Sequence, residues 1–180
     1  MKVNVLSEHE LLKWSRKYDD EQSLSDKNIE THIGSRLRST KELSKTDLFE
    51  VIKWKFEGFK GRQMKVTRHA ELTDDLVLRK VSEVVLDLDK KYDEYKIDLL
   101  CVFDGIGAAV ASTILTFHDP ENYGVFDIHV WRELFGEQPK NLHTTKNYLH
   151  LVNELRKIGA KYKLSVRTVE KAYYKKNYDK

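Results

Sequence analysis

Apolar residues recur every three or four positions along most of the chain, and this spacing places them on one face of an α-helix. Ile29, Ile33 and Leu37 show the pattern in one segment. In a segment opened by Thr73-Asp74-Asp75, the expected apolar face is Leu76, Val77, Val81, Val84, Val85 and Leu88. Only 2 prolines and 8 glycines occur in the 180 residues, too few for the many turns of an all-β fold. We therefore expect an all-α protein.

The composition argues against several classes of protein. No stretch of the sequence is long and apolar enough to suggest a membrane span. The first residues, Met1 to Asn4, lack the basic and apolar regions of a signal peptide. The single cysteine, Cys101, cannot form an internal disulfide or supply the four ligands of a zinc or iron–sulfur site. We expect a cytoplasmic, nucleoid-associated protein, or a nuclear one if the source is a eukaryote.

A basic and aromatic segment lies between residues 53 and 68, in a chain of net charge +3. Basic side chains neutralise phosphates, and aromatic rings stack on bases. The segment contains Lys53, Trp54, Lys55, Phe56, Phe59, Lys60, Arg62, Lys65 and Arg68. We expect Arg62 and Lys65 to contact DNA, and Trp54 or Phe59 to stack on a base or fill the gap that it leaves. Alternatively, Trp54 and Phe56 are core residues of an amphipathic helix with a solvated basic face.

A turn with two glycines, Asp104-Gly105-Ile106-Gly107, separates two predicted helices, and the whole unit spans residues 95–117. Glycine permits backbone angles that other residues resist, and Ile106 is expected to point inward. Ala108 begins a second helix rich in small residues, which lets a phosphate approach its N-terminus. Such a hairpin can hold a DNA backbone without reading its sequence. An ordinary helix–helix connection is the alternative.

An acidic residue follows the hairpin at the start of another predicted helix, which stops at Gly136. The segment reads Phe126-Asp127-Ile128-His129-Val130. An aspartate in this position is by itself a common N-cap, because its carboxylate accepts the free N–H groups of the first turn.

Together, the hairpin and the aspartate segment resemble the helix–hairpin–helix base-excision DNA glycosylases, a DNA-repair family. The resemblance extends from Leu99 to Gly136. It implies an N-glycosylase that flips a damaged or mispaired base from double-stranded DNA towards Asp127. That carboxylate would stabilise an oxocarbenium-like transition state or activate water. His129 would support the loop, and the Gly105 and Gly107 carbonyls would hold a monovalent cation, K⁺ or Na⁺.

The family architecture implies two helical lobes. We expect residues 1–40 and 137–180 to form one lobe and residues 41–136 to form the other, with DNA across the cleft between them. We expect a monomer without an iron–sulfur cluster. The base to be removed stays open, because the shape of the pocket sets that choice.

The sequence departs from the family at two positions. Family members that also cut the strand carry a lysine in the second hairpin helix, where this chain has Ala109. We therefore expect base release without strand cutting, although Lys53 or Lys55 could supply an amine in space. Asp104 replaces the usual hairpin proline and could cap the next helix. Two other functions stay open: a non-catalytic DNA-binding module and a helical protein-interaction domain.

Overall fold

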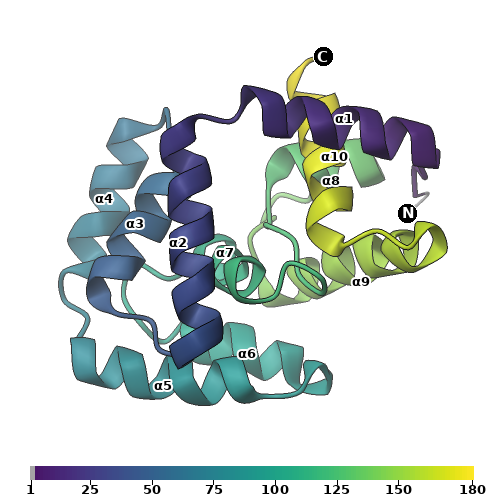
Figure 1. Cartoon of the computed structure of the whole chain (residues 1–180). Helices are drawn as coiled ribbons and strands as arrows, with labels where there is room; N and C mark the ends of the chain where they lie inside the picture. The colour runs from purple at the N-terminus through teal and green to yellow at the C-terminus, as the bar shows by residue number, and fades with distance from the viewer. Residues whose placement is uncertain (1–2) are drawn as a thin grey trace.

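The computed structural model describes residues 3–180, which form ten α-helices, one short 3-10 helix and no strand (Figure 1). The all-α prediction is confirmed. The prediction that a signal peptide is absent involves Met1 and Lys2, which lie outside the described residues. Within residues 3–180, no helix combines the length and the apolar character that a bilayer span requires.

The helices are α1 (Glu8–Glu21), α2 (Leu24–Thr40), α3 (Lys45–Lys55), α4 (Lys60–Ala70), α5 (Asp75–Asp87), η1 (Lys90–Tyr92), α6 (Asp93–Leu100), α7 (Ala108–His118), α8 (Ile128–Phe135), α9 (Thr145–Tyr162) and α10 (Val166–Tyr178). Polar residues define where several of them begin. Ser7 with Glu10 and Ser44 with Asp47 form capping boxes at α1 and α3, in which side chains satisfy free backbone N–H groups.

The helices gather into two groups (Figure 1). One contains α2 to α7, and the other contains α1, α8, α9 and α10, with α10 packed mainly against α1 and α8. From the sequence, we expected residues 1–40, which include α2, to pack with the C-terminal residues, and residues 41–136, which include α8, to form the lobe with the hairpin. In the structure, α8 packs against α10, and α2 packs against α7 and α3. Gly34 permits this close approach, because a Cβ atom there would lie 2.7 Å from the Phe117 carbonyl oxygen. Arg38 also donates to that oxygen at 2.8 Å.

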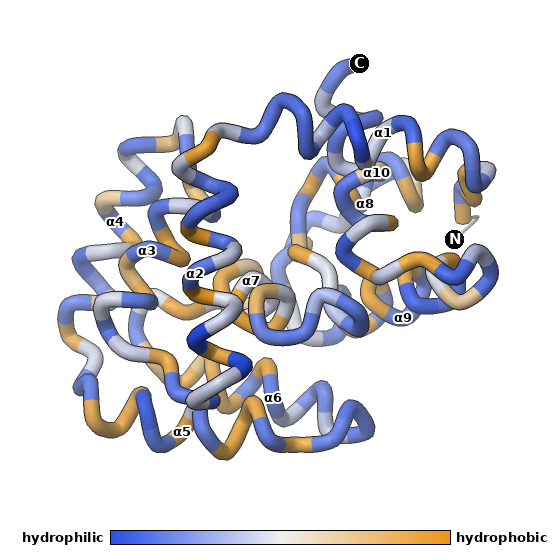
Figure 2. Tube along the Cα trace, viewed as in Figure 1, coloured by the Kyte–Doolittle hydropathy of each residue, from blue (hydrophilic) through white to orange (hydrophobic). Residues whose placement is uncertain are grey.

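Helix α7 lies at the centre of the molecule, and every residue from Ala108 to Phe117 is buried. Buried apolar residues of the surrounding helices form one core cluster with it, and Figure 2 shows how hydrophobic positions are distributed along the chain. Burial of these apolar side chains stabilises the fold, because apolar surface is removed from water. It also gives the hairpin that precedes α7 a rigid attachment.

The predicted apolar face of α5 is partly wrong. The buried side consists of Leu78, Ser82, Val85 and Leu86, whereas Leu76, Val77 and Val84 are exposed. The helix is rotated because Ser82 faces inward: its hydroxyl accepts the backbone N–H of Leu43 at 2.8 Å and donates to the Arg79 carbonyl at 2.9 Å. Counting apolar residues cannot reveal this polar contact.

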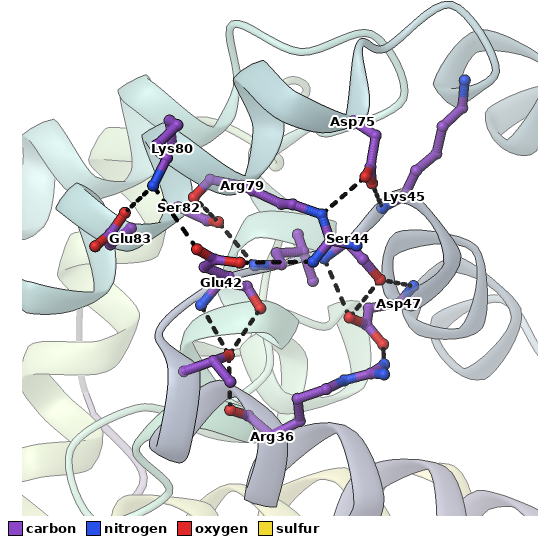
Figure 3. A network of polar contacts seen from close by, with 12 residues as sticks. Arg36, Glu42, Ser44, Lys45, Asp47, Asp75, Arg79, Lys80, Ser82 and Glu83 are labelled. Atoms are coloured by element: carbon purple, nitrogen blue, oxygen red, sulfur yellow. Dashed lines mark hydrogen bonds and ion pairs between the residues drawn. The ribbon is translucent and has the colours of Figure 1, made fainter.

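A polar network joins the end of α2 and the start of α3 to α5 (Figure 3). Asp47 pairs with Arg36 as well as with Ser44, and the backbone N–H of Lys45 donates to Asp75 at 2.6 Å. Lys80 of α5 lies 3.8 Å from Glu42. These contacts fix the first turn of α3, whose last turn faces the candidate site.

Candidate active site

A cavity of about 750 Å³ lies between the two groups of helices. Its volume falls within the range of roughly 300–1,000 Å³ that is usual for small-molecule pockets. One wall comes from the end of α3, the start of α4 and Ala109 of α7, and the other comes from α8 and α10. The lining includes five of the predicted site residues, Trp54, Phe59, Arg62, Asp127 and His129, whereas Lys65 and the hairpin residues Gly105 to Ala108 lie outside it. Residues far apart in the sequence therefore meet around one hollow.

Asp127 is the N-cap residue of α8, and its backbone is extended (φ −135°, ψ 149°). One carboxylate oxygen accepts the backbone N–H of His129 at 2.9 Å, and the other accepts a hydrogen bond from Nζ of Lys55 at 2.7 Å. The side chain retains 20% of its exposure and faces the cavity. Asp127 therefore caps the helix and also presents a carboxylate to the hollow.

Two opposing effects set the pKa of Asp127. Burial raises the pKa of the carboxyl group, but the Lys55 ammonium and the His129 N–H group outweigh burial and hold it below its usual value. The carboxyl group is therefore ionised at neutral pH. A charged carboxylate is the form that can stabilise a developing cation or accept a proton.

Lys55 is the last residue of α3, and its side chain is only 7% exposed. It lines the same cavity as Ala109, the position where the sequence lacks an amine. Lys53, the other lysine considered from the sequence, is 56% exposed and lies 3.9 Å from Glu50. An amine is therefore present beside Asp127, and it comes from α3.

His129 is held by α10. Its Nδ1 atom lies 3.0 Å from Oδ1 of Asn177, and its ring packs edge-on against Tyr174 and Tyr178. The ring therefore links the first turn of α8 to the last turns of α10, next to Asp127.

The predicted stacking residues differ in their surroundings. The Trp54 ring is half-buried, packs edge-on against Phe117 at 5.0 Å and lies 5.3 Å from the Arg167 guanidinium, although it also lines the cavity. Phe59 is 69% exposed at the edge of the cavity, where a side chain can reach a DNA helix. Arg62 is exposed, with its guanidinium 4.9 Å from the centre of the buried Phe56 ring. The first turn of α4 therefore presents aromatic and basic side chains together.

The hairpin turn needs a glycine at position 105. Its φ is +85°, and a Cβ atom there would lie 2.7 Å from the Cβ of Ala70 on α4. Ile106 is buried as predicted, and its N–H donates to the Phe103 carbonyl at 3.0 Å. Close packing against Gly105 places α4, which carries the exposed Lys65, beside the hairpin.

Gly107 is the exposed N-cap residue of α7, and no side chain caps this helix. Asp104 therefore does not cap α7. The free N–H groups of the first turn, including that of Ala108, remain available to an anion. The Gly107 carbonyl accepts the N–H of Ala111 at 2.9 Å, so it would offer only its second lone pair to the predicted monovalent cation.

Several cavity residues were not predicted from the sequence. Asp26 of α2 and Glu57 after α3 both line the cavity, and a hydrogen bond with Asp26, aided by burial, raises the pKa of Glu57 to about 7. Arg167 of α10 is buried, donates to Glu30 at 2.9 Å and 3.0 Å, and pairs with Glu170. No motif marks these residues, because they meet only through packing of α2 and α10. Among residues 3–180, no cluster of three or more His, Cys, Asp or Glu side chains is arranged to hold a metal.

Comparisons with known proteins give one structural match. No family model matches the sequence, and no curated protein does. The chain is similar to the crystal structure of the Methanocaldococcus jannaschii 8-oxoguanine glycosylase/lyase in complex with a 15mer DNA containing 8-oxoguanine. The sequences are 18% identical, the match covers 94% of this chain and 98% of that chain, and the TM-score is 0.46. At this similarity, the match by itself carries no conclusion about function.

Proposed function

We propose that this protein is a DNA N-glycosylase that removes a damaged or mispaired base. The observation that carries the proposal is the ionised carboxylate of Asp127 on the wall of a cavity of about 750 Å³, large enough to admit a flipped base. The sequence resemblance assigns the catalytic role to the same aspartate. A carboxylate facing a cavity of this kind favours an enzyme over a non-catalytic DNA-binding module.

Base removal breaks the bond between C1′ of deoxyribose and the base, and positive charge develops on the sugar. Asp127 would face this charge and stabilise it, or accept a proton from the attacking water. Lys55 and the His129 N–H group keep the carboxylate charged and fixed in position. The pairing of Asp26 with Glu57 places further polar groups where a base would enter.

DNA would lie across the hairpin and the first turn of α4. The uncapped N-terminus of α7, at Gly107 and Ala108, would bind a phosphate, with a monovalent cation on the hairpin carbonyls as a further counter-charge. Arg62 and Lys65 would contact neighbouring phosphates. The exposed ring of Phe59 would fill the gap that the flipped base leaves.

The test is base release from duplex oligonucleotides at enzyme excess. Each duplex carries one lesion: uracil, thymine opposite guanine, oxidised guanine or an alkylated purine. Alkali cuts at abasic sites, so cutting after alkali identifies the base that the enzyme removes. Duplex binding without release of any base would contradict the proposal and favour the non-catalytic module, whereas absence of DNA binding would favour a protein-interaction domain.

A further inference from the structure

Helices α5 and α6 lie side by side at the lower edge of the molecule in Figure 1 and expose much apolar surface. Most of the large apolar side chains that are exposed within residues 3–180 belong to positions 72 to 102. The α5–α6 face, as we call it, consists of side chains between 38% and 69% exposed: Leu76, Val77, Val84, Tyr92, Tyr95, Leu99 and Val102. Soluble monomers seldom expose a contiguous apolar patch larger than a few hundred Å², and larger patches mark sites where another molecule binds.

The apolar residues of this face follow the spacing of helices that pack along one another. Each of two stripes repeats at intervals that alternate between three and four residues: Val77, Val81 and Val84 on α5, and Tyr92, Tyr95, Leu99 and Val102 along α6 and its flanking turns. Such intervals are typical of the contact line between packed helices. Helix α5 already buries Leu78, Ser82, Val85 and Leu86 against the core, so the stripe on its other side is a second apolar surface.

A groove of about 450 Å³ joins the two stripes. Five residues of α5 and one of α6 line it: Leu76, Val77, Lys80, Val81, Val84 and Leu99. Nζ of Lys80 lies 2.9 Å from Glu83 and 3.8 Å from Glu42, so the aliphatic part of its side chain lines the groove while its charge is paired. The groove therefore offers apolar surface to a partner without an unpaired charge.

We propose that a second copy of this chain covers the α5–α6 face, so that the protein forms a symmetric dimer. In this dimer, the helix pair of one copy packs against the same pair of the other, in the manner of a four-helix bundle. Each stripe then contacts a helix of the partner. The inference revises the expectation of a monomer, goes beyond the proposed function and does not depend on it.

The area of the α5–α6 face matches one side of a dimer interface. A standard interface buries roughly 800 Å² on each partner, and about 60% of that area is apolar. A fully exposed side chain of the size found here offers about 100–200 Å². At the observed exposures, the seven side chains of the face together offer on the order of 500 Å² of apolar surface. This is the apolar area that a stable dimer of standard size requires.

The charges around the face favour a second copy over a strongly acidic or basic partner. Arg79 pairs with Asp75 at 2.8 Å, as Lys80 does with Glu83, so charges of both signs alternate along α5. A surface with paired charges gives little attraction to a partner of one sign. The whole chain has a net charge of only +3, so two copies repel each other weakly.

The proposed dimer leaves the candidate active site accessible. The cavity is lined from α1, α2, α7, α8, α10 and the segments around α3 and α4, and no described residue of α5 or α6 contributes to it. Each copy would therefore keep its own open cavity. The dimer can be tested without DNA, so its outcome is separate from that of the lesion assay.

The test measures the mass of the full chain by sedimentation equilibrium over a range of protein concentrations. Interfaces of standard size have dissociation constants from µM to pM, so the wild type should reach the mass of two chains below about 100 µM. Val77→Glu combined with Val84→Glu should raise the dissociation constant by about 100-fold or more, because four carboxylates would enter an apolar interface without partners. Tyr95→Glu tests α6 independently and should also weaken the dimer.

Two controls make the result specific to this face. Leu24→Glu changes an equally apolar residue, 77% exposed on α2, and should leave the dissociation constant unchanged. Because Val77, Val84 and Tyr95 are exposed, their variants should unfold in urea as the dilute wild type does. Hydroxyl-radical footprinting should show that Leu76, Tyr95 and Leu99 become protected as the concentration rises.

A wild-type protein with the mass of one chain up to about 500 µM, far above the usual dissociation constants, would overturn the inference. So would a dimer that tolerates both the α5 and the α6 variants. Protection that appears on another surface, with the α5–α6 face still reactive, would likewise assign the dimer to a different interface.

Discussion

Nζ of Lys55, at the end of α3, donates a hydrogen bond to Oδ2 of Asp127, at the start of α8, at 2.7 Å. The two residues belong to different groups of helices, so the ion pair connects the two walls of the cavity. The same contact holds a carboxylate in its charged form and places an amine beside it. Structure and proposed chemistry therefore depend on one pair of side chains.

The ion pair should stabilise the fold in a pH-dependent way. Because its pKa is lowered in the folded protein, Asp127 contributes stability above its unfolded pKa of about 3.9, and this contribution is lost as the pH falls further. At pH 7, Asp127→Asn should lower the free energy of unfolding by about 1–3 kcal/mol, because Lys55 loses its partner. The difference between the two proteins should shrink as the pH falls from about 4 to about 2.

Urea unfolding of both proteins across this pH range measures the effect. Glu94→Gln, which removes one exposed negative charge on α6, is the control and should show no comparable change. A difference between wild type and Asp127→Asn that is constant from pH 7 to pH 2 would mean that the ion pair does not hold the carboxylate ionised.

Gly105→Ala should destabilise the protein. The residue has φ +85°, and the new Cβ atom would come within 2.8 Å of the Ala70 backbone nitrogen. The left-handed backbone alone costs about 1–2 kcal/mol for a residue with a side chain, and the contact with α4 adds to it. Urea unfolding should therefore show a loss of at least about 2 kcal/mol. A variant as stable as the wild type would contradict the described turn.

Gly107→Ala should affect DNA binding more than stability. The new Cβ atom would meet nothing within 4 Å, and φ is −97°, so the backbone accepts alanine. We expect a loss of no more than about 1 kcal/mol in stability, the usual scale for a change of N-cap residue. The methyl group would stand where the phosphate approaches the N-terminus of α7, so fluorescence anisotropy with a duplex should show weaker binding. Unchanged affinity would mean that the hairpin backbone does not contact DNA.

Arg62→Gln and Lys65→Gln should each reduce the salt dependence of DNA binding. Both side chains are exposed on α4, next to the hairpin. Each lost phosphate contact should lower the magnitude of the slope of log K against log salt by about 1. Titrations at several salt concentrations measure the slope. Lys157→Gln on α9 is the control, and an equal effect there would indicate a general charge effect.

Local features of the fold were predictable from the sequence, because they depend on neighbouring residues. Helical spacing predicted the all-α fold, and the capping box of Ser7 and Glu10 is readable as a motif. The position of Asp127 at the start of a helix was predictable for the same reason. The rotation of α5 was not, because it depends on the hydrogen bond between Ser82 and the distant Leu43.

The composition of the cavity depends on tertiary packing, and the sequence therefore predicted it incompletely. Lys55 and Asp127 are 72 residues apart, and nothing local distinguishes Lys55 from Lys53. The two lysines are two residues apart on α3, so they lie on different sides of the helix: Lys55 faces the cavity and Lys53 faces solvent. Asp26 and Glu170 also line the cavity. The sequence did not predict this, because no motif on α2 or α10 indicates that these helices meet at the site.

The most direct test of the proposed function compares single-turnover base release by the wild type and by Asp127→Asn, at enzyme excess, on the duplex that gives a signal in the lesion panel. Asparagine has the same shape as aspartate but no charge, so the variant should bind the duplex while its rate falls by about 100-fold or more. Glu94→Gln should release the base at the wild-type rate. Release by Asp127→Asn at the wild-type rate would contradict a catalytic role for this carboxylate.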